Sequence, residues 1–424
     1  MSVSRRNFML GSAAAGLVGG RALASSSSKA EYLVVVFAEG GWDVTFTFEP
    51  KYDVDAIEGP EVDGDEEGLE THGGIVIGSN PTLRPNVSSF FSRWHDHACV
   101  VNGIWMGSIA HDPCRYRILT GTPDVARPDM ATIMGFKTGG DLPLGSVDLS
   151  GWQITGPLAA STGRIGRNSQ IKALIDPSTN FTAPENFPNG YPMFATNAVD
   201  RDAVAEFLEK RTAKMRDIRG FDEDKNDRLL DDLLISAERG SRFREQSASI
   251  LDALTLGNGA SLDKQVEIGV NLLKGGLCKA ITIDSKQDWD SHDNNSLQHG
   301  MYNALFGGLD TLMSELQEAE LLDKTLVVVL SEMTRTPKLN TSGGKDHWGH
   351  GSAVILGGCV RGSSQLGATD DLLESRTVDL QTGDLTESGS LNKYDNLAAG
   401  ILEMLDVDPE EWLPGVTPYR GAVG

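Results

Sequence analysis

The chain has 424 residues, of which 60 are acidic and 37 basic, so its formal net charge is −23. A surface this acidic repels nucleic acid and anionic lipid, which excludes nucleic-acid binding as a function. The length allows one large α/β domain or two smaller ones, and no segment after the first 24 residues is long and apolar enough to span a membrane.

The first 24 residues have the features of an export signal. Arg5 and Arg6 form a twin-arginine pattern, an apolar stretch rich in Gly and Ala follows, and Ala22 and Ala24 mark an A-x-A cleavage site. We expect the twin-arginine export machinery to deliver a periplasmic or secreted protein that is cleaved after Ala24. The alternative is that the segment stays attached as an amphipathic anchor.

The remaining chain alternates strand-like and helix-like segments. Buried β-type runs predict strands at 32–37, 98–104, 277–283, 326–330 and 353–356. Helical periodicity predicts helices at 86–94, 199–217, 222–254, 261–274, 297–321 and 392–405, and residues 380–385 predict a hairpin. This alternation predicts a mainly parallel sheet with crossover helices.

We expect one α/β domain over residues 30–424 with two additions. Residues 53–74 are acidic and rich in Gly, which predicts a surface insertion or loop. The charged helical stretch from about 199 to 274 predicts a helical lobe outside the sheet. The four cysteines could form up to two disulfides or stay as buried thiols.

Histidines and carboxylates cluster in the segments that follow the predicted strands. In an open α/β sheet the loops after the strands share one edge, so residues far apart in sequence can meet there. Neutral imidazole together with carboxylate suits a divalent metal, most often zinc or manganese. The candidate ligands are Asp43, Asp290, His292, Glu332, Asp346, His347 and His350.

Each candidate has an alternative interpretation. Asp43 follows two glycines that allow a sharp turn, and it could bind a metal or cap that turn. Asp290, preferred to Asp288, could bind a metal with His292, or the loop could cap the helix near residue 297. Two His residues three apart beside Asp346 could be two ligands, or a ligand with its orienting partner.

Two arginines and one histidine complete the predicted site. Glu332 could bind a metal while Arg335 holds an anionic group, or the two could pair with each other. His111 could be a ligand, a general acid or base, or a nucleophile. Arg115 could neutralise a phosphate or sulfate, or pair with nearby carboxylates.

Five segments resemble, in order, motifs of the exported family called domain of unknown function 1501, which looks related to the alkaline phosphatase and sulfatase superfamily. The segments are VVVFAEGGWD, AHDPCRYRILTG, DWDSH, VVVLSEMTRTP and GGKDHWGHGSAVILGG. The resemblance runs from about residue 31 to the end. It implies a three-layer α/β/α, alkaline-phosphatase-like domain with metal ligands at Asp43, Asp290, His292, Glu332 and one of His347 or His350.

The chain departs from that pattern at the places where the superfamily carries its nucleophile and second metal. His111 stands at the nucleophile position, Ala110 replaces the usual Ser, and Met333 replaces a metal-binding His. These departures do not support a two-metal phosphatase with a Ser nucleophile. A one-metal site, or a site without catalysis, remains open.

The leading hypothesis is an exported metal-dependent hydrolase of phosphate or sulfate esters, acting on a small molecule or a polysaccharide. The metal would activate water, while His111, Arg115 and Arg335 would assist catalysis. The alternative is a non-catalytic exported envelope or binding protein that keeps the same scaffold.

Overall fold

The computed structural model describes residues 29–60, 66–164, 198–216, 223–246 and 260–424. The predicted export signal lies outside these residues. Within them, no helix is both long enough and apolar enough to cross a membrane.

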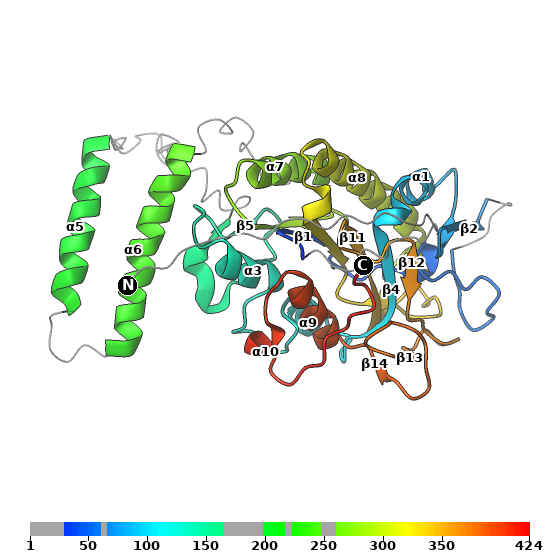
Figure 1. Cartoon of the computed structure of the whole chain (residues 1–424). Coiled ribbons are helices and arrows are strands. Elements are labelled where there is room, and N and C mark those ends of the chain that lie inside the picture. The colour runs from blue at the N-terminus through cyan, green and yellow to red at the C-terminus, as the bar shows by residue number, and fades with distance from the viewer. Residues whose placement is uncertain (1–28, 61–65, 165–197, 217–222, 247–259) are drawn as a thin grey trace, which may run out of the picture.

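A sheet of eight strands forms the centre of the described structure (Figure 1). Its order is β12 (Ser364–Leu366), β4 (Ala98–Trp105), β11 (His350–Gly357), β8 (Thr325–Leu330), β1 (Tyr32–Phe37), β7 (Ala280–Asp284), β5 (Ser146–Asp148) and β6 (Thr162–Arg164). Only β11 runs antiparallel to its neighbours in this sheet, so the predicted mainly parallel sheet is confirmed.

Helices cover both faces of the sheet and make three layers. The layer on one face consists of α1 (Pro85–Trp94), α7 (Leu262–Lys274) and α8 (Gln298–Glu318). The other face carries α2 (His111–Thr120), α3 (Met130–Thr138) and α9 (Tyr394–Met404), with the short α10 (Pro409–Trp412) beyond (Figure 1).

The alternation of side chains along β1 explains this arrangement. Val34 and Val36 pack into one buried cluster, while Leu33, Val35 and Phe37 pack into the other. All five are at most 2% exposed. Because successive side chains of a strand point to opposite faces, a strand apolar at every position must be covered on both sides.

The other predicted elements match the structure in part. Residues 68–72 of the predicted insertion form β2 (Gly68–His72), paired with β3 (Ile75–Ser79). The predicted hairpin at 380–385 lies within a longer loop, which connects the antiparallel strands β13 (Thr377–Val378) and β14 (Ser390–Leu391). Neither α2 nor α3 is among the helices predicted from the sequence.

The predicted lobe contains helices of two kinds. Helices α5 (Ala198–Arg216) and α6 (Glu223–Gln246) stand beside the sheet domain (Figure 1). Helix α7, in contrast, packs on β7 and α8 with most of its apolar residues buried, so it belongs to the sheet domain. All four cysteines are buried free thiols.

Helix α7 begins at a side-chain cap that can be tested without disturbing the core. The exposed Ser261 accepts a hydrogen bond on Oγ from the backbone N–H of Lys264. Replacing Ser261 with Ala is expected to lower the free energy of unfolding by about 1 kcal/mol, measured by urea denaturation. Ser261→Asp, which keeps a capping oxygen, is expected to stay near wild type. An equal loss in both variants would contradict the role of the cap.

Candidate functional site

Four chain segments bring the candidate residues to one edge of the sheet. The segments after β1, β7 and β8 leave the carboxyl ends of parallel strands, and α2 starts shortly after β4. Because β11 runs antiparallel, its first residues lie at the same edge. Gly40 has a φ of +122°, and a Cβ there would lie 2.6 Å from the backbone N of Asp290. A glycine at position 40 therefore allows the loop after β1 to contact the loop after β7.

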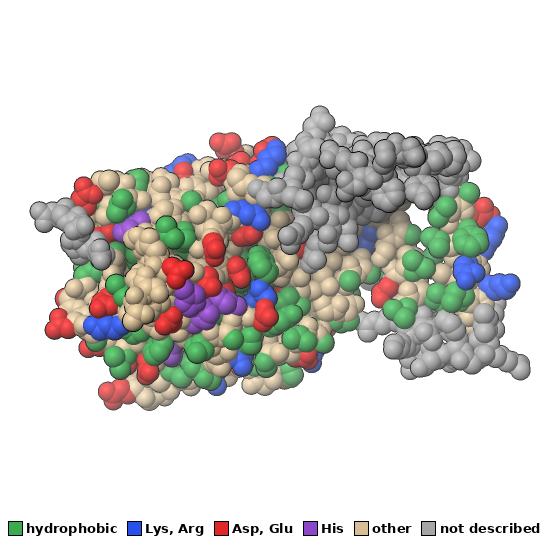
Figure 2. Space-filling view, turned by 180° about the vertical axis from the view of Figure 1, so that it is seen from behind, with side chains coloured by type: hydrophobic (Ala, Val, Ile, Leu, Met, Phe, Trp, Pro, Cys, Tyr) green, Lys and Arg blue, Asp and Glu red, His purple; other side chains and the backbone are tan. Residues whose placement is uncertain are grey.

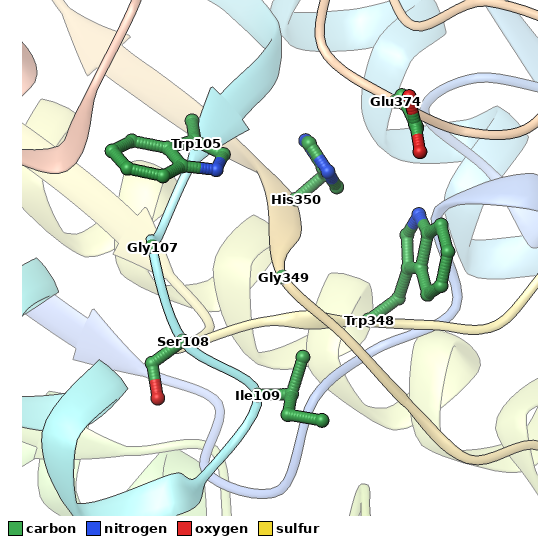
Figure 3. A pocket seen from close by; sticks show the side chains of 8 residues that line it. All are labelled: Trp105, Gly107, Ser108, Ile109, Trp348, Gly349, His350 and Glu374. Carbon is green, nitrogen blue, oxygen red and sulfur yellow. The ribbon is translucent and has the colours of Figure 1, made fainter.

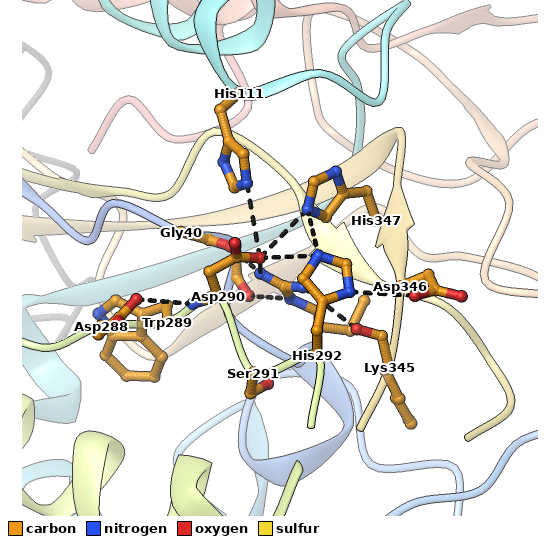
Figure 4. A network of polar contacts seen from close by, with 12 residues as sticks. Gly40, His111, Asp288, Trp289, Asp290, Ser291, His292, Lys345, Asp346 and His347 are labelled. Carbon is orange, nitrogen blue, oxygen red and sulfur yellow. Dashed lines mark hydrogen bonds and ion pairs between the residues drawn. The ribbon is translucent and has the colours of Figure 1, made fainter. Parts of the chain in front are cut away.

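Asp290 is the centre of the site (Figure 4). Its Oδ1 lies 3.1 Å from Nε2 of His292, 3.1 Å from Nε2 of His347 and 3.5 Å from Nε2 of His111. The Nε2 atoms of His292 and His347 are themselves 2.8 Å apart. Ligand-type atoms of His111, Asp290 and His347 all lie within 4.8 Å of one another.

The opposite nitrogen of each ring faces an acceptor. The Nδ1 atom of His292 lies 3.0 Å from Asp346 Oδ1, that of His347 2.8 Å from Ile109 O, and that of His111 2.7 Å from Glu332 Oε1. In the neutral tautomer that carries its hydrogen on Nδ1, each ring donates to the acceptor behind it, and its Nε2 presents a lone pair toward Asp290.

In that tautomer the lone pairs repel one another unless a proton or a metal cation lies among them. The buried Nε2 atom of His111 has no hydrogen-bond partner among the described residues. Three imidazole nitrogens and one carboxylate oxygen form a ligand set suited to zinc or manganese. The acceptors behind each ring are the kind of partners that orient metal-binding histidines. The side chains present therefore fit one divalent metal.

Arg335 contacts Asp290 from the interior of the protein and is not exposed to solvent. Its side chain is fully buried, and it donates from Nη2 to Asp290 Oδ1 at 2.7 Å. It also donates to the backbone oxygens of Gly40, Gly41 and Lys345. Burial raises the pKa of Asp290, but the hydrogen bond and charge of Arg335 outweigh it and hold the pKa below its usual value. Arg335 thus positions Asp290 and is not directed at a ligand.

Glu332 is fully buried and supports His111 from behind. Its Oε1 accepts hydrogen bonds from the backbone N–H of Gly40 at 2.8 Å and from His111 Nδ1. This hydrogen bond raises the pKa of His111, although burial opposes it. The predicted pairing of Glu332 with Arg335 is not present, since each has another partner.

Arg115 pairs with carboxylates, as one of the sequence interpretations stated. It donates to Asp112 Oδ1, and its Nη1 lies 3.8 Å from Glu39 Oε1. Glu39 is half-buried, and one of its carboxylate oxygens lies within 4.8 Å of a ring nitrogen of His111 and of a carboxylate oxygen of Glu332. Glu39 was not among the predicted site residues, although its position just after β1 was an available signal.

Asp43 is separated from the histidines by its own set of partners. Both it and Lys345 are fully buried, and Lys345 Nζ lies 2.8 Å from Asp43 Oδ2. Asp43 also accepts hydrogen bonds from Thr45 N, Thr45 Oγ1 and Asn295 Nδ2. With these contacts made, Asp43 caps the turn that follows β1, and its Oδ2 faces the ammonium group of Lys345. Lys345 was also absent from the predicted site, although it directly precedes the DHWGH segment.

His350 faces a different space from His347. Its Nδ1 accepts a hydrogen bond from the backbone N–H of Ser375 at 3.0 Å and lies 2.7 Å from Ser375 Oγ. Burial lowers its pKa. Of the predicted ligands, the structure therefore brings together Asp290, His292 and His347, with Glu332 and Asp346 behind the rings, and it leaves out Asp43 and His350.

The charge around the cluster favours a dication. Four carboxylates, from Glu39, Asp290, Glu332 and Asp346, face two guanidinium groups, from Arg115 and Arg335. The side chains of Asp290 and of the three histidines around it, His111, His292 and His347, are 21–38% exposed. On the surface, histidines gather on one face of the molecule next to acidic side chains (Figure 2).

Comparisons with known proteins place the chain in a family. No curated protein matches it. Similar solved structures include Ps i-CgsB, with 10% identity and a TM-score of 0.40 over 92% of this chain and 76% of that one. The lipoteichoic acid synthase LtaP from Listeria monocytogenes has 8% identity and a TM-score of 0.38, over 94% and 77%. The alkaline phosphatase from the Antarctic bacterium TAB5 has 10% identity and a TM-score of 0.37, over 90% and 99%. The family model described as protein of unknown function (DUF1501) matches residues 30–414, and the chain belongs to that family.

Proposed function

We propose that this chain is an exported metal-dependent hydrolase of phosphate or sulfate esters. The observation that carries the proposal is the convergence of three imidazole Nε2 atoms on Asp290 Oδ1, each ring fixed by an acceptor behind it. Export rests on the twin-arginine pattern at Arg5 and Arg6.

A divalent metal held by His111, Asp290, His292 and His347 would supply a Lewis acid and lower the pKa of a bound water. The protein's own groups prepare that site. Glu332 and Asp346 keep Nε2 of His111 and His292 free of hydrogen, since each carboxylate accepts from Nδ1. Arg335 fixes the orientation of Asp290 from the buried side. In this arrangement His111 serves as a ligand instead of a nucleophile.

The nucleophile in this proposal is water. Ala110 offers no hydroxyl, and the thiol of Cys114 is buried and donates to Ser108 O. Burial raises the pKa of Cys114 to about 11, so its thiolate is scarce near neutral pH. Arg115 stands beside Glu39 at the rim, where it could contact an anionic ester oxygen.

The second candidate is a non-catalytic binding protein of the cell envelope. Two observations favour it: Ala110 and His111 stand where a nucleophile is expected, and Lys345 neutralises Asp43, a carboxylate that a two-metal enzyme would use. Both candidates require the cluster to bind a ligand, but only the hydrolase turns over an ester.

Metal content and turnover separate the two candidates. Purified protein is expected to carry about one divalent metal per chain by elemental analysis, and His347→Ala is expected to lose it. His97→Ala, a histidine outside the cluster, is the matched control and should keep the metal. Metal-dependent hydrolysis of an aryl phosphate or aryl sulfate supports the hydrolase. Metal binding without turnover of either ester supports the binding protein, and a metal-free protein contradicts the hydrolase.

A further inference from the structure

A pocket of about 360 Å³ lies at the same sheet edge as the histidine cluster (Figure 3). Its side chains include two indoles, Trp105 and Trp348, and three polar groups, Ser108, His350 and Glu374. This volume is at the lower end of the range for small-molecule sites, which start near roughly 300 Å³.

The pocket and the cluster share a wall. Ile109 lines the pocket, and its backbone oxygen accepts the hydrogen bond from Nδ1 of His347. His347 and Trp348 are the two residues of β10 (His347–Trp348), which pairs with β9 (Thr334–Arg335). Because successive strand side chains point to opposite faces, His347 turns toward the cluster while Trp348 turns toward the pocket. A ligand in the pocket would therefore contact Trp348, the chain neighbour of the cluster residue His347.

Backbone and side-chain contacts fix the shape of the pocket. A Cβ on Gly349 would lie 2.8 Å from Ser108 O, so only glycine lets these two wall segments approach. The segments are joined by a hydrogen bond from Met106 N to Gly349 O of 2.9 Å. Trp348 donates from Nε1 to Leu373 O at 2.9 Å, which holds its indole in place.

The polar groups of the pocket provide both a donor and acceptors. Since Nδ1 of His350 accepts from Ser375 N, the hydrogen of the neutral ring is on Nε2, which can donate. The carboxylate of Glu374 accepts, and the hydroxyl of Ser108 can do either. Figure 3 shows His350 between the two indoles, with Glu374 above Trp348.

This combination complements a ring that has apolar C–H faces and hydroxyl groups at its edge. The C–H face packs on an indole, and the hydroxyls pair with a carboxylate and an imidazole N–H. A polyanion such as a nucleic-acid strand does not fit, because Glu374 and the net charge of −23 repel it. We propose that this pocket binds a sugar ring that carries the ester group, an inference that rests on the proposed function and names its substrate class.

Binding of neutral sugars tests the pocket separately from turnover. The probes are glucose, galactose, maltose, cellobiose and lactose at millimolar concentrations, with saturation-transfer NMR on the full-length mature protein, before and after metal removal by EDTA. At least one sugar is expected to bind under both conditions. Trp105→Ala and Glu374→Gln are each expected to weaken that binding about tenfold. Glu387→Gln, which removes an exposed carboxylate elsewhere, is the matched control and should bind as wild type.

The outcomes distinguish the two proposals. Sugar binding that Glu374→Gln weakens supports the pocket, even if no ester is hydrolysed, and in that case the proposed function alone fails. Aryl-ester hydrolysis with no binding of any of the five sugars overturns the pocket alone. Equal binding by wild type, Trp105→Ala and Glu374→Gln also overturns it. Because Glu374 is exposed, its variant keeps the test decisive should Trp105→Ala not fold.

Discussion

Replacing Asp290 with Asn is expected to reduce metal affinity by about a hundredfold or more and to abolish metal-dependent turnover. The reason is the central position of Oδ1, which faces Arg335 and three imidazole Nε2 atoms. Asn keeps the shape of the side chain but removes the negative charge. It therefore leaves the buried guanidinium of Arg335 without its carboxylate and the metal without its anionic ligand.

Asp288→Asn is the matched control for this experiment. Asp288 is exposed and lies two residues away, and among the described residues its side chain accepts one long hydrogen bond, from the backbone N–H of Asp290 at 3.4 Å. Metal titration followed by activity measurements compares the two variants. The assignment is contradicted if Asp290→Asn binds metal as wild type does, or if both variants lose metal equally.

Much of the fold could be predicted because its core strands are apolar at every position. Residues 32–37 and 326–330 are too apolar to face water on either side, and they form the adjacent parallel strands β1 and β8. Helices α2 and α3 were missed because their apolar residues do not follow the spacing of one helical face. In α2, the buried residues are Cys114 and the run 118–120.

The sequence could place the candidate residues at one edge but could not assign their neighbours. Asp43 and Asp290 both follow parallel strands and read alike in sequence. The two residues differ in their neighbours: the ammonium group of Lys345 lies beside Asp43, whereas three imidazole rings lie around Asp290. These contacts join residues as many as 302 positions apart, and the side-chain directions that decide them depend on the completed tertiary structure.

Replacing Lys345 with Met is expected to lower the free energy of unfolding by about 3–5 kcal/mol, because a buried carboxylate then loses its neutralising charge. Both side chains of the pair are fully buried, and the ammonium group has no hydrogen-bond acceptor of good geometry among the described residues. The negative charge of Asp43 is therefore what stabilises the buried ammonium group of Lys345. Urea denaturation of the metal-free protein measures the loss.

The double variant Asp43→Asn, Lys345→Met separates lost charge from lost packing. Removing both charges leaves no unpaired ion, so the double variant is expected to be more stable than Lys345→Met alone. Metal content should stay at one ion per chain in Lys345→Met, since Asp43 lies apart from the histidine cluster. A loss below about 1 kcal/mol in the single variant would mean that water reaches Asp43, because a carboxylate hydrated in this way no longer needs the ammonium group.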